Sequence, residues 1–217
     1  HRAWARTGGG AGRATVVVAG ATLAWLALLS AGVASGAVID APMPGVPIFF
    51  GVSLGGGLAI GLSRLGQRLA LGLTLPALVA FQGFRLPLEL VLHSWGESGT
   101  IPMTMTWDGS NLDVVSGVLA LLCAPLAARW RGAAWLANVV GLALLVNVGR
   151  VAVLSSGLPF SWPDVSPPLQ LAMYLPYALI GPVCVGGALA GHVILTRALL
   201  RAPGAARWRE AGRASRS

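Results

Sequence analysis

Lysine is absent from the sequence, and charged residues of both signs together make up only 10% of it. All 15 basic residues are arginines, which leaves a net charge of +8. Soluble domains carry about 25% charged residues, so this scarcity of charge excludes a soluble globular class. The positive balance alone would suit a nucleic-acid partner. However, the arginines stand at the ends of apolar runs, which indicates membrane topology and no nucleic acid.

Residues that commonly hold metals or form disulfides are also few. There are two cysteines and three histidines. Cys123 and Cys184 lie inside apolar runs, which predicts small buried side chains rather than a disulfide. The sequence holds no HExxH spacing and no phosphate-binding loop. We therefore expect no metal and no cofactor.

Long hydrophobic runs are what the sequence has in abundance. Hydrophobic residues make up 55% of the chain, and the mean hydropathy is +0.75. Runs of about 20 apolar residues recur, and each is long enough to cross a bilayer as a helix. The fold prediction is an all-α bundle of transmembrane helices over 14–198, between a basic lead (1–13) and a basic tail (199–217). The predicted spans are 14–39, 46–63, 69–95, 113–128, 133–156 and 169–195.

The arginines also predict the orientation of this multi-pass bundle. They occur in the lead, in the turns at 64–68 and 129–131, and in the tail, but not in the other three connections. The positive-inside rule then places both termini in the cytoplasm. Abundant Ala, Gly and Arg without Lys is typical of a GC-rich bacterial genome. We therefore predict a protein of the bacterial cytoplasmic (inner) membrane.

Small residues and prolines predict local features of two spans. The second span contains Gly51-xxx-Gly55 and Gly57-xxx-Gly61, spacings that allow helices to approach closely. Pro76 and Pro87 fall inside the third span, where each removes a backbone hydrogen bond. We expect a kink or local unwinding there.

The third span carries a polar stripe. At about 100° per residue, Gln82, Arg85, Glu89 and His93 lie within roughly 80° of one another on the helix. Arg85 to Glu89 and Glu89 to His93 are i,i+4 pairs, which predicts contacts between them. A charged side chain in the bilayer centre costs about 2.5–3.5 kcal/mol on insertion scales. The stripe therefore predicts either a functional pocket or a structural ion pair inside the bundle.

The fifth span adds a second polar pair to the predicted pocket. Asn147 and Arg150 are spaced i,i+3 in the outer half of that span. The polar connection above it predicts a pocket that opens to the extracytoplasmic side. His192 is expected near the cytoplasmic end, remote from this pocket, and Asn138 is the only sign of a polar path inward. Three residues are expected to line the pocket entrance: Asp108, Asn111 and Asp113.

The stretch 111–122 resembles the exosortase/archaeosortase family, whose members carry a Cys-Ser-Gly signature at the outer start of a helix. Ser116-Gly117 matches the end of that signature, and Asn147-Val148-Gly149-Arg150 matches the family's Asn-x-x-Arg motif. The resemblance covers roughly 96–155. It implies that Arg150 binds or polarises a substrate carbonyl or carboxylate. The 82–156 region also resembles other bacterial multi-pass membrane proteins, which implies no activity.

The sequence departs from the family at the catalytic position. Val115 stands where the family has its nucleophilic cysteine, and Cys123 is about 12 Å further along the helix. A cysteine-transpeptidase mechanism is therefore not expected.

Three functional hypotheses follow from the predicted pocket. The first is a distantly exosortase-like membrane protein that binds or processes an anionic or peptide-like substrate at the outer leaflet. The second is a small proton-coupled transporter, since intramembrane Arg, Glu and His with proline-broken helices suit a carrier. The third is an accessory subunit whose polar stripe pairs with a helix of a membrane protein partner. Whether the protein is an enzyme stays open.

Overall fold

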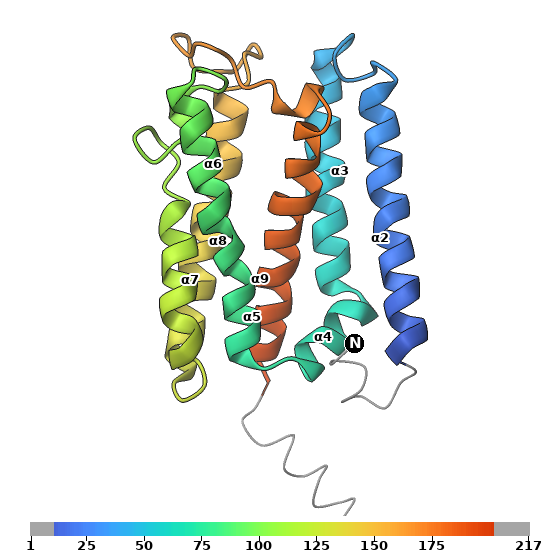
Figure 1. Ribbon diagram of the computed structural model, residues 1–217, viewed down its shortest axis with the longest axis vertical. Helices are drawn as coiled ribbons and strands as arrows, with labels where there is room; N and C mark the ends of the chain where they lie inside the picture. The colour runs from blue at the N-terminus through green and yellow to red at the C-terminus, as the bar shows by residue number, and fades with distance from the viewer. Residues whose placement is uncertain (1–10, 202–217) are drawn as a thin grey trace, which may run out of the picture.

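The computed structural model describes residues 11–201, and every regular element in that range is helical. The longer helices stand upright side by side (Figure 1). In chain order the elements are α2 (Ala11–Ala34), α3 (Pro42–Leu62), α4 (Arg64–Gly72), α5 (Leu75–Phe81), η1 (Gln82–Phe84), α6 (Arg85–Glu97), η2 (Met103–Met105), α7 (Val114–Leu126), α8 (Arg131–Leu154), η3 (Leu171–Met173), η4 (Tyr177–Leu179), η5 (Gly181–Val185) and α9 (Gly186–Leu199).

The bundle has two ends with different structures. In Figure 1, α6, α7 and α8 stand on one side, α2 and α3 on the other, and α9 between them. The short helix α4 lies across the lower end, where α2 begins and α9 ends. The connections 98–113 and 155–176 lie toward the upper end.

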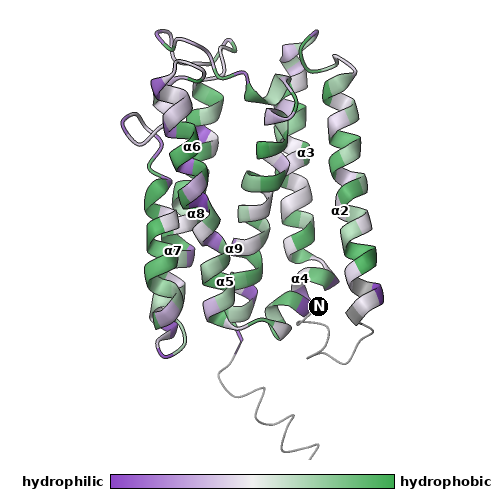
Figure 2. Ribbon diagram, viewed as in Figure 1, coloured by the Kyte–Doolittle hydropathy of each residue, from purple (hydrophilic) through white to green (hydrophobic). Residues whose placement is uncertain are grey.

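Five of the helical stretches are long and apolar enough to cross a membrane: Thr15–Ala34, Pro42–Leu62, Leu75–Glu97, Arg131–Leu154 and Tyr177–Leu199. Figure 2 shows green segments alternating with pale ones along these helices, with little purple between their ends. The helix α7 is equally apolar but has only 13 residues, about 20 Å at 1.5 Å per residue. The predicted all-α class is confirmed. The count of six spans and the cytoplasmic termini stay predictions.

The boundaries of two predicted spans are wrong. The stretch 69–95 is not one helix, because α4 ends at Gly72 and α5 begins at Leu75. The side chain of Thr74 accepts a hydrogen bond from the Ala77 amide, and Pro76 occupies the first turn of α5, where its missing N–H costs nothing. The last span begins at Tyr177 rather than at 169.

The second predicted proline effect is found where α5 passes into α6. Pro87 cannot donate a hydrogen bond to the Gly83 carbonyl one turn earlier. The backbone tightens into the 3₁₀ turn η1 just before this point. Pro182 lies in a similar irregular segment, since η5 is a π-helical turn at the start of the last span.

One of the two predicted glycine pairs is a helix contact. A Cβ on Gly57 would overlap the backbone of Gly186, and one on Gly61 would lie 2.7 Å from the Cβ of Val193. These two glycines therefore let α3 approach α9 closely. Gly51 and Gly55 have no neighbouring atom within 4 Å of such a Cβ, so this pair makes no such contact within the described residues.

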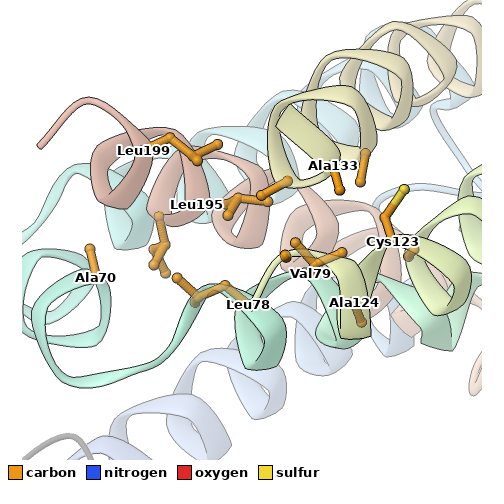
Figure 3. Packing of buried hydrophobic residues seen from close by; sticks show 13 residues of the cluster. Ala70, Leu78, Val79, Cys123, Ala124, Ala133, Leu195 and Leu199 are labelled. Carbon is orange, nitrogen blue, oxygen red and sulfur yellow. The ribbon is translucent and has the colours of Figure 1, made fainter. Parts of the chain in front are cut away.

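The lower half of the bundle has an apolar core of alanines and larger aliphatic side chains (Figure 3). Its labelled residues come from α4, α5, α7, α8 and α9: Ala70, Leu78, Val79, Cys123, Ala124, Ala133, Leu195 and Leu199. Cys123 is buried there as a small apolar residue, as its position predicted. The predictions for the basic lead and tail concern residues that lie almost entirely outside 11–201.

Candidate functional site

Arg85 begins α6 and is the centre of a buried polar cluster. Its side chain is 2% exposed. Its Nε donates a hydrogen bond of 2.5 Å to Oδ2 of Asp113, and its Nη2 forms an ion pair with Oδ1 of the same carboxylate. This two-point contact is the strongest geometry for a guanidinium and a carboxylate. Nη1 donates to the Gly141 carbonyl at 2.9 Å.

Glu89 lies one turn further along α6 and is 1% exposed. Both of its carboxylate oxygens accept from one group, Nδ2 of Asn111, at 3.1 and 2.9 Å. The same Nδ2 donates to the Met105 carbonyl, and Oδ1 of Asn111 accepts from the Asp113 amide. Asn111 therefore fixes the connection just before α7 and presents Asp113 to Arg85.

His192 joins the cluster from α9. Its Nε2 lies 3.2 Å from Nη1 of Arg85, and its Nδ1 lies 3.0 Å from Oδ1 of Asn138. A guanidinium can only donate, so Nε2 is the acceptor and Nδ1 carries the proton. Nδ2 of Asn138 in turn donates to Oγ1 of Thr196 at 2.7 Å. A directed chain of hydrogen bonds thus runs from Arg85 toward the lower half of the bundle.

Gly141 on α8 makes room for this arrangement. A Cβ there would lie 2.5 Å from Cε1 of His192 and 3.5 Å from Nη1 of Arg85. A side chain there would clash with the His192 ring, while its contact with Arg85 would be at an ordinary van der Waals distance. The glycine supplies its carbonyl to Arg85 while leaving the space that both side chains fill.

A cavity lies beside the cluster, in the half of the bundle toward the connections 98–113 and 155–176. Its empty space, including the open mouth, is about 840 Å³. Its walls come from α3, α6, α8, η5 and the segment 169–173, and most of the lining side chains are aliphatic or aromatic. Arg85, Glu89 and Asp113 are the charged residues in this wall, and the free thiol of Cys184 also lines it.

A second polar group lies near the upper end and is more open. The ring of His93 stacks on Trp107 at 3.8 Å, and its Nε2 lies 3.6 Å from Glu97. Asn147 donates to the Ser110 carbonyl at 2.8 Å.

Arg150 belongs to the same upper group. It donates two hydrogen bonds to Oδ1 of Asn147 and lies over the ring of Trp162 at 5.6 Å. It is exposed and does not line the cavity.

The structure corrects several expected positions. Arg85 forms its ion pair with Asp113 rather than with Glu89, and His93 pairs with Glu97 and Asp108. Asn111 and Asp113 are buried in the cluster instead of lining an entrance, whereas Asp108 is exposed. These contacts come from the fold of the 98–113 connection, which helix periodicity does not describe.

The expected position of His192 is also wrong, because it touches Arg85 directly. A polar path does continue from the cluster toward the lower end of the bundle, since His192 links Arg85 to Asn138. The separation of 107 residues explains why sequence reasoning missed the contact. The remaining stripe residue, Gln82, lies beside the cluster and donates to the Ala188 carbonyl of α9 at 3.2 Å.

The bonding pattern limits the chemistry of the cluster. The donors of Arg85 already bind Asp113, Gly141 and His192, so this guanidinium has little capacity left for an anion. Glu89, by contrast, receives a single donor group and borders the cavity. Among the described residues, no group of three His, Cys, Asp or Glu side chains is placed to hold a metal ion.

Comparison with known proteins gives no family for the chain. No family model matches it, and neither a curated protein nor a solved structure is found to be similar.

Proposed function

We propose that this chain is a multi-pass protein of the bacterial inner membrane that binds a small amphipathic molecule in the cavity beside Glu89. The carrying observation is a cavity lined mostly by aliphatic and aromatic side chains, with buried charged groups in one wall. Ligand sites of this kind combine an apolar body with a few placed polar groups. Buried ionisable residues inside a membrane bundle are costly and rare, and they usually mark a functional site.

The orientation proposed for the bundle follows from the arginines. Arg64, Arg68, Arg129 and Arg131 flank the lower ends of the helices, while the connections 98–113 and 155–176 contain none. The positive-inside rule favours a cytoplasmic lower end, with α7 counted as a sixth, short span. The cavity then lies in the extracytoplasmic half, where a molecule from the outer leaflet can reach it.

This proposal keeps only one part of the exosortase-like hypothesis, the binding of a substrate at the outer leaflet, and drops the transpeptidase chemistry. Val115 is exposed on α7 and does not line the cavity, so neither its chemistry nor its position favours a transpeptidase. Arg150 is the better candidate for an anionic substrate, since it is exposed on the upper surface. Binding of an amphipathic molecule in the cavity needs neither residue.

A proton-coupled carrier is the second candidate, and one observation favours it. The hydrogen bonds from Arg85 through His192 and Asn138 to Thr196 continue below the cavity. Uptake of a labelled amphipathic molecule into proteoliposomes would distinguish a carrier from a binding protein. The accessory-subunit hypothesis is less favoured, because Arg85 finds its partners, Asp113 and His192, within the chain.

The test is photo-crosslinking of a dodecanol that carries a diazirine to the full-length protein in lipid nanodiscs. We expect labelling of cavity-lining residues, mapped by mass spectrometry. Ala152→Phe fills the cavity, because Ala152 is a buried lining residue of α8. Val153→Phe is the matched control, since its neighbour Val153 is 44% exposed and does not line the cavity.

Loss of cavity labelling in Ala152→Phe with retention in Val153→Phe supports the proposal. Equal labelling in both variants, or labelling confined to lipid-facing residues, overturns it.

A further inference from the structure

The charged side chains around the cavity do not balance. Arg85, Glu89 and Asp113 are the buried residues of formal charge in the described part of the chain. Arg85 and Asp113 neutralise each other through their two-point contact. Glu89 is left without a cation of its own, although it is 1% exposed. An unpaired buried charge is strongly disfavoured.

The hydrogen bonds of Glu89 lead to the same conclusion. An ionised carboxylate offers about four acceptor positions over its two oxygens, and here it receives only the amide group of Asn111. The remaining acceptor capacity belongs to a side chain that borders the cavity. The empty site therefore suits a carboxyl group that keeps its proton, and an occupied one suits a carboxylate with a cationic donor.

We infer that the ligand of this cavity is an amphipathic amine, whose ammonium group pairs with Glu89 while its apolar chain fills the space toward Phe49 and Leu145. This rests on the proposed cavity binding and specifies its substrate class. An ammonium supplies both the missing positive charge and three N–H donors. A neutral alcohol supplies only one donor and no charge, and a carboxylate or phosphate supplies no positive charge to pair with an ionised Glu89.

When the ligand binds, its ammonium group takes the place of the proton on the carboxyl group of Glu89. The arriving ammonium keeps its own proton, the carboxyl group of Glu89 releases its proton to water, and the carboxylate then pairs with the ammonium. No bond other than O–H breaks, and the charge of the site is unchanged.

Other charged and titratable groups surround Glu89 without replacing it. Arg85 and His93 lie on its own helix, and Asp113 precedes α7. Tyr177 and Cys184 border the same cavity from the last span. Arg85 is held by Asp113 and by His192 of α9, and His93 faces Glu97 and Asp108. Among these groups Glu89 is the buried carboxyl group that lacks a cationic partner.

The test compares dodecylammonium, dodecanol and dodecanoate as competitors of the photoreactive dodecanol in nanodiscs of the full-length protein. We expect dodecylammonium to compete at least about 30-fold better than dodecanol, since a buried charge pair favours binding strongly. Calorimetry in two buffers of different ionisation enthalpy, corrected with empty nanodiscs, should detect about one proton released per dodecylammonium bound.

Glu89→Gln should abolish both the preference for dodecylammonium and the proton release. Glu97→Gln is the matched control, because Glu97 lies on the same helix with 67% of its side chain exposed, and should change neither. If Glu89→Gln does not fold, the number of protons that the wild type releases per dodecylammonium bound still tests the proposal.

The outcomes separate the two proposals. Equal competition by the amine and the alcohol, without proton release, overturns the amine specificity but leaves cavity binding intact. Absence of competition by any of the three overturns both.

Discussion

The two polar groups of this protein contain the same residue types in different surroundings. The buried cluster has Arg85, His192 and Asn111, which are at most 1% exposed. The upper group has Arg150, His93 and Asn147, of which the arginine is exposed and the other two are half-buried.

The difference is one of bonding as well as depth. Each buried member contacts partners from other elements, whereas Arg150 bonds mainly to Asn147 within its own helix. Residue type therefore says little about the role of a polar side chain in this bundle. In the buried cluster, loss of one partner leaves another buried polar group without a hydrogen bond. In the upper group, water can replace the lost partner.

Loss of Arg85 should have the largest effect. Arg85→Met leaves Asp113 buried without its cation, which should lower the free energy of unfolding by about 3–5 kcal/mol. Unfolding in mixed micelles, followed by circular dichroism, measures this change. The double variant Arg85→Met/Asp113→Leu should recover most of the stability, because no unpaired charge is left. If the double variant is as unstable as the single one, the unpaired charge of Asp113 is not the cause of the lost stability.

Replacement of His192 should have the next largest effect on stability, and it should exceed the effect of replacing His93. His192→Leu removes the acceptor of Arg85 and the donor to Asn138, with an expected cost of roughly 2–3 kcal/mol. His93→Leu loses a ring contact with Trp107 near the surface, worth about 1 kcal/mol. Thermal unfolding of the two purified variants in one detergent compares them. Equal shifts would contradict the distinction between the clusters.

The asparagines test the support of Glu89. Asn111→Leu deprives Glu89 of its donor and the connection before α7 of its fixed geometry, at a cost of roughly 1–2 kcal/mol. Asn147→Leu should cost less than about 1 kcal/mol, because Asn147 is half-buried and can exchange its bonds for water. Hydrogen exchange of the 98–113 segment should accelerate only in Asn111→Leu. If exchange accelerates in both variants, the 98–113 segment depends on both asparagines, and the distinction between the two groups is wrong.

Arg150→Ala should have the smallest effect. Its contacts with Asn147 and Trp162 lie at the surface, where such interactions contribute less than about 1 kcal/mol. Crosslinking of the cavity by the photoreactive dodecanol should be unchanged. If Arg150→Ala abolishes that labelling while the protein stays folded, the ligand site belongs to the upper group instead.

Sequence reasoning reached the helical class and most helix positions, because hydrophobic periodicity and length carry this information directly. It placed Arg85 and Glu89 together on one helix face, which is correct. It could not choose their partners, since Asp113 depends on how the 98–113 connection folds. His192 depends on α9 returning beside α6, and Gly141 acts through the space it leaves empty.

The pairing of Arg85 with Asp113 has a consequence for biosynthesis. The helix α7 has 13 residues and begins beside a buried carboxylate, so it is poorly suited to enter a bilayer alone. Its counter-ion is on the preceding span, and Gly117 of α7 packs directly against Leu86 of α6. We expect the translocon to release the two helices as one hairpin, already neutralised. His192, synthesised 107 residues after Arg85, then completes the cluster when the last helix arrives.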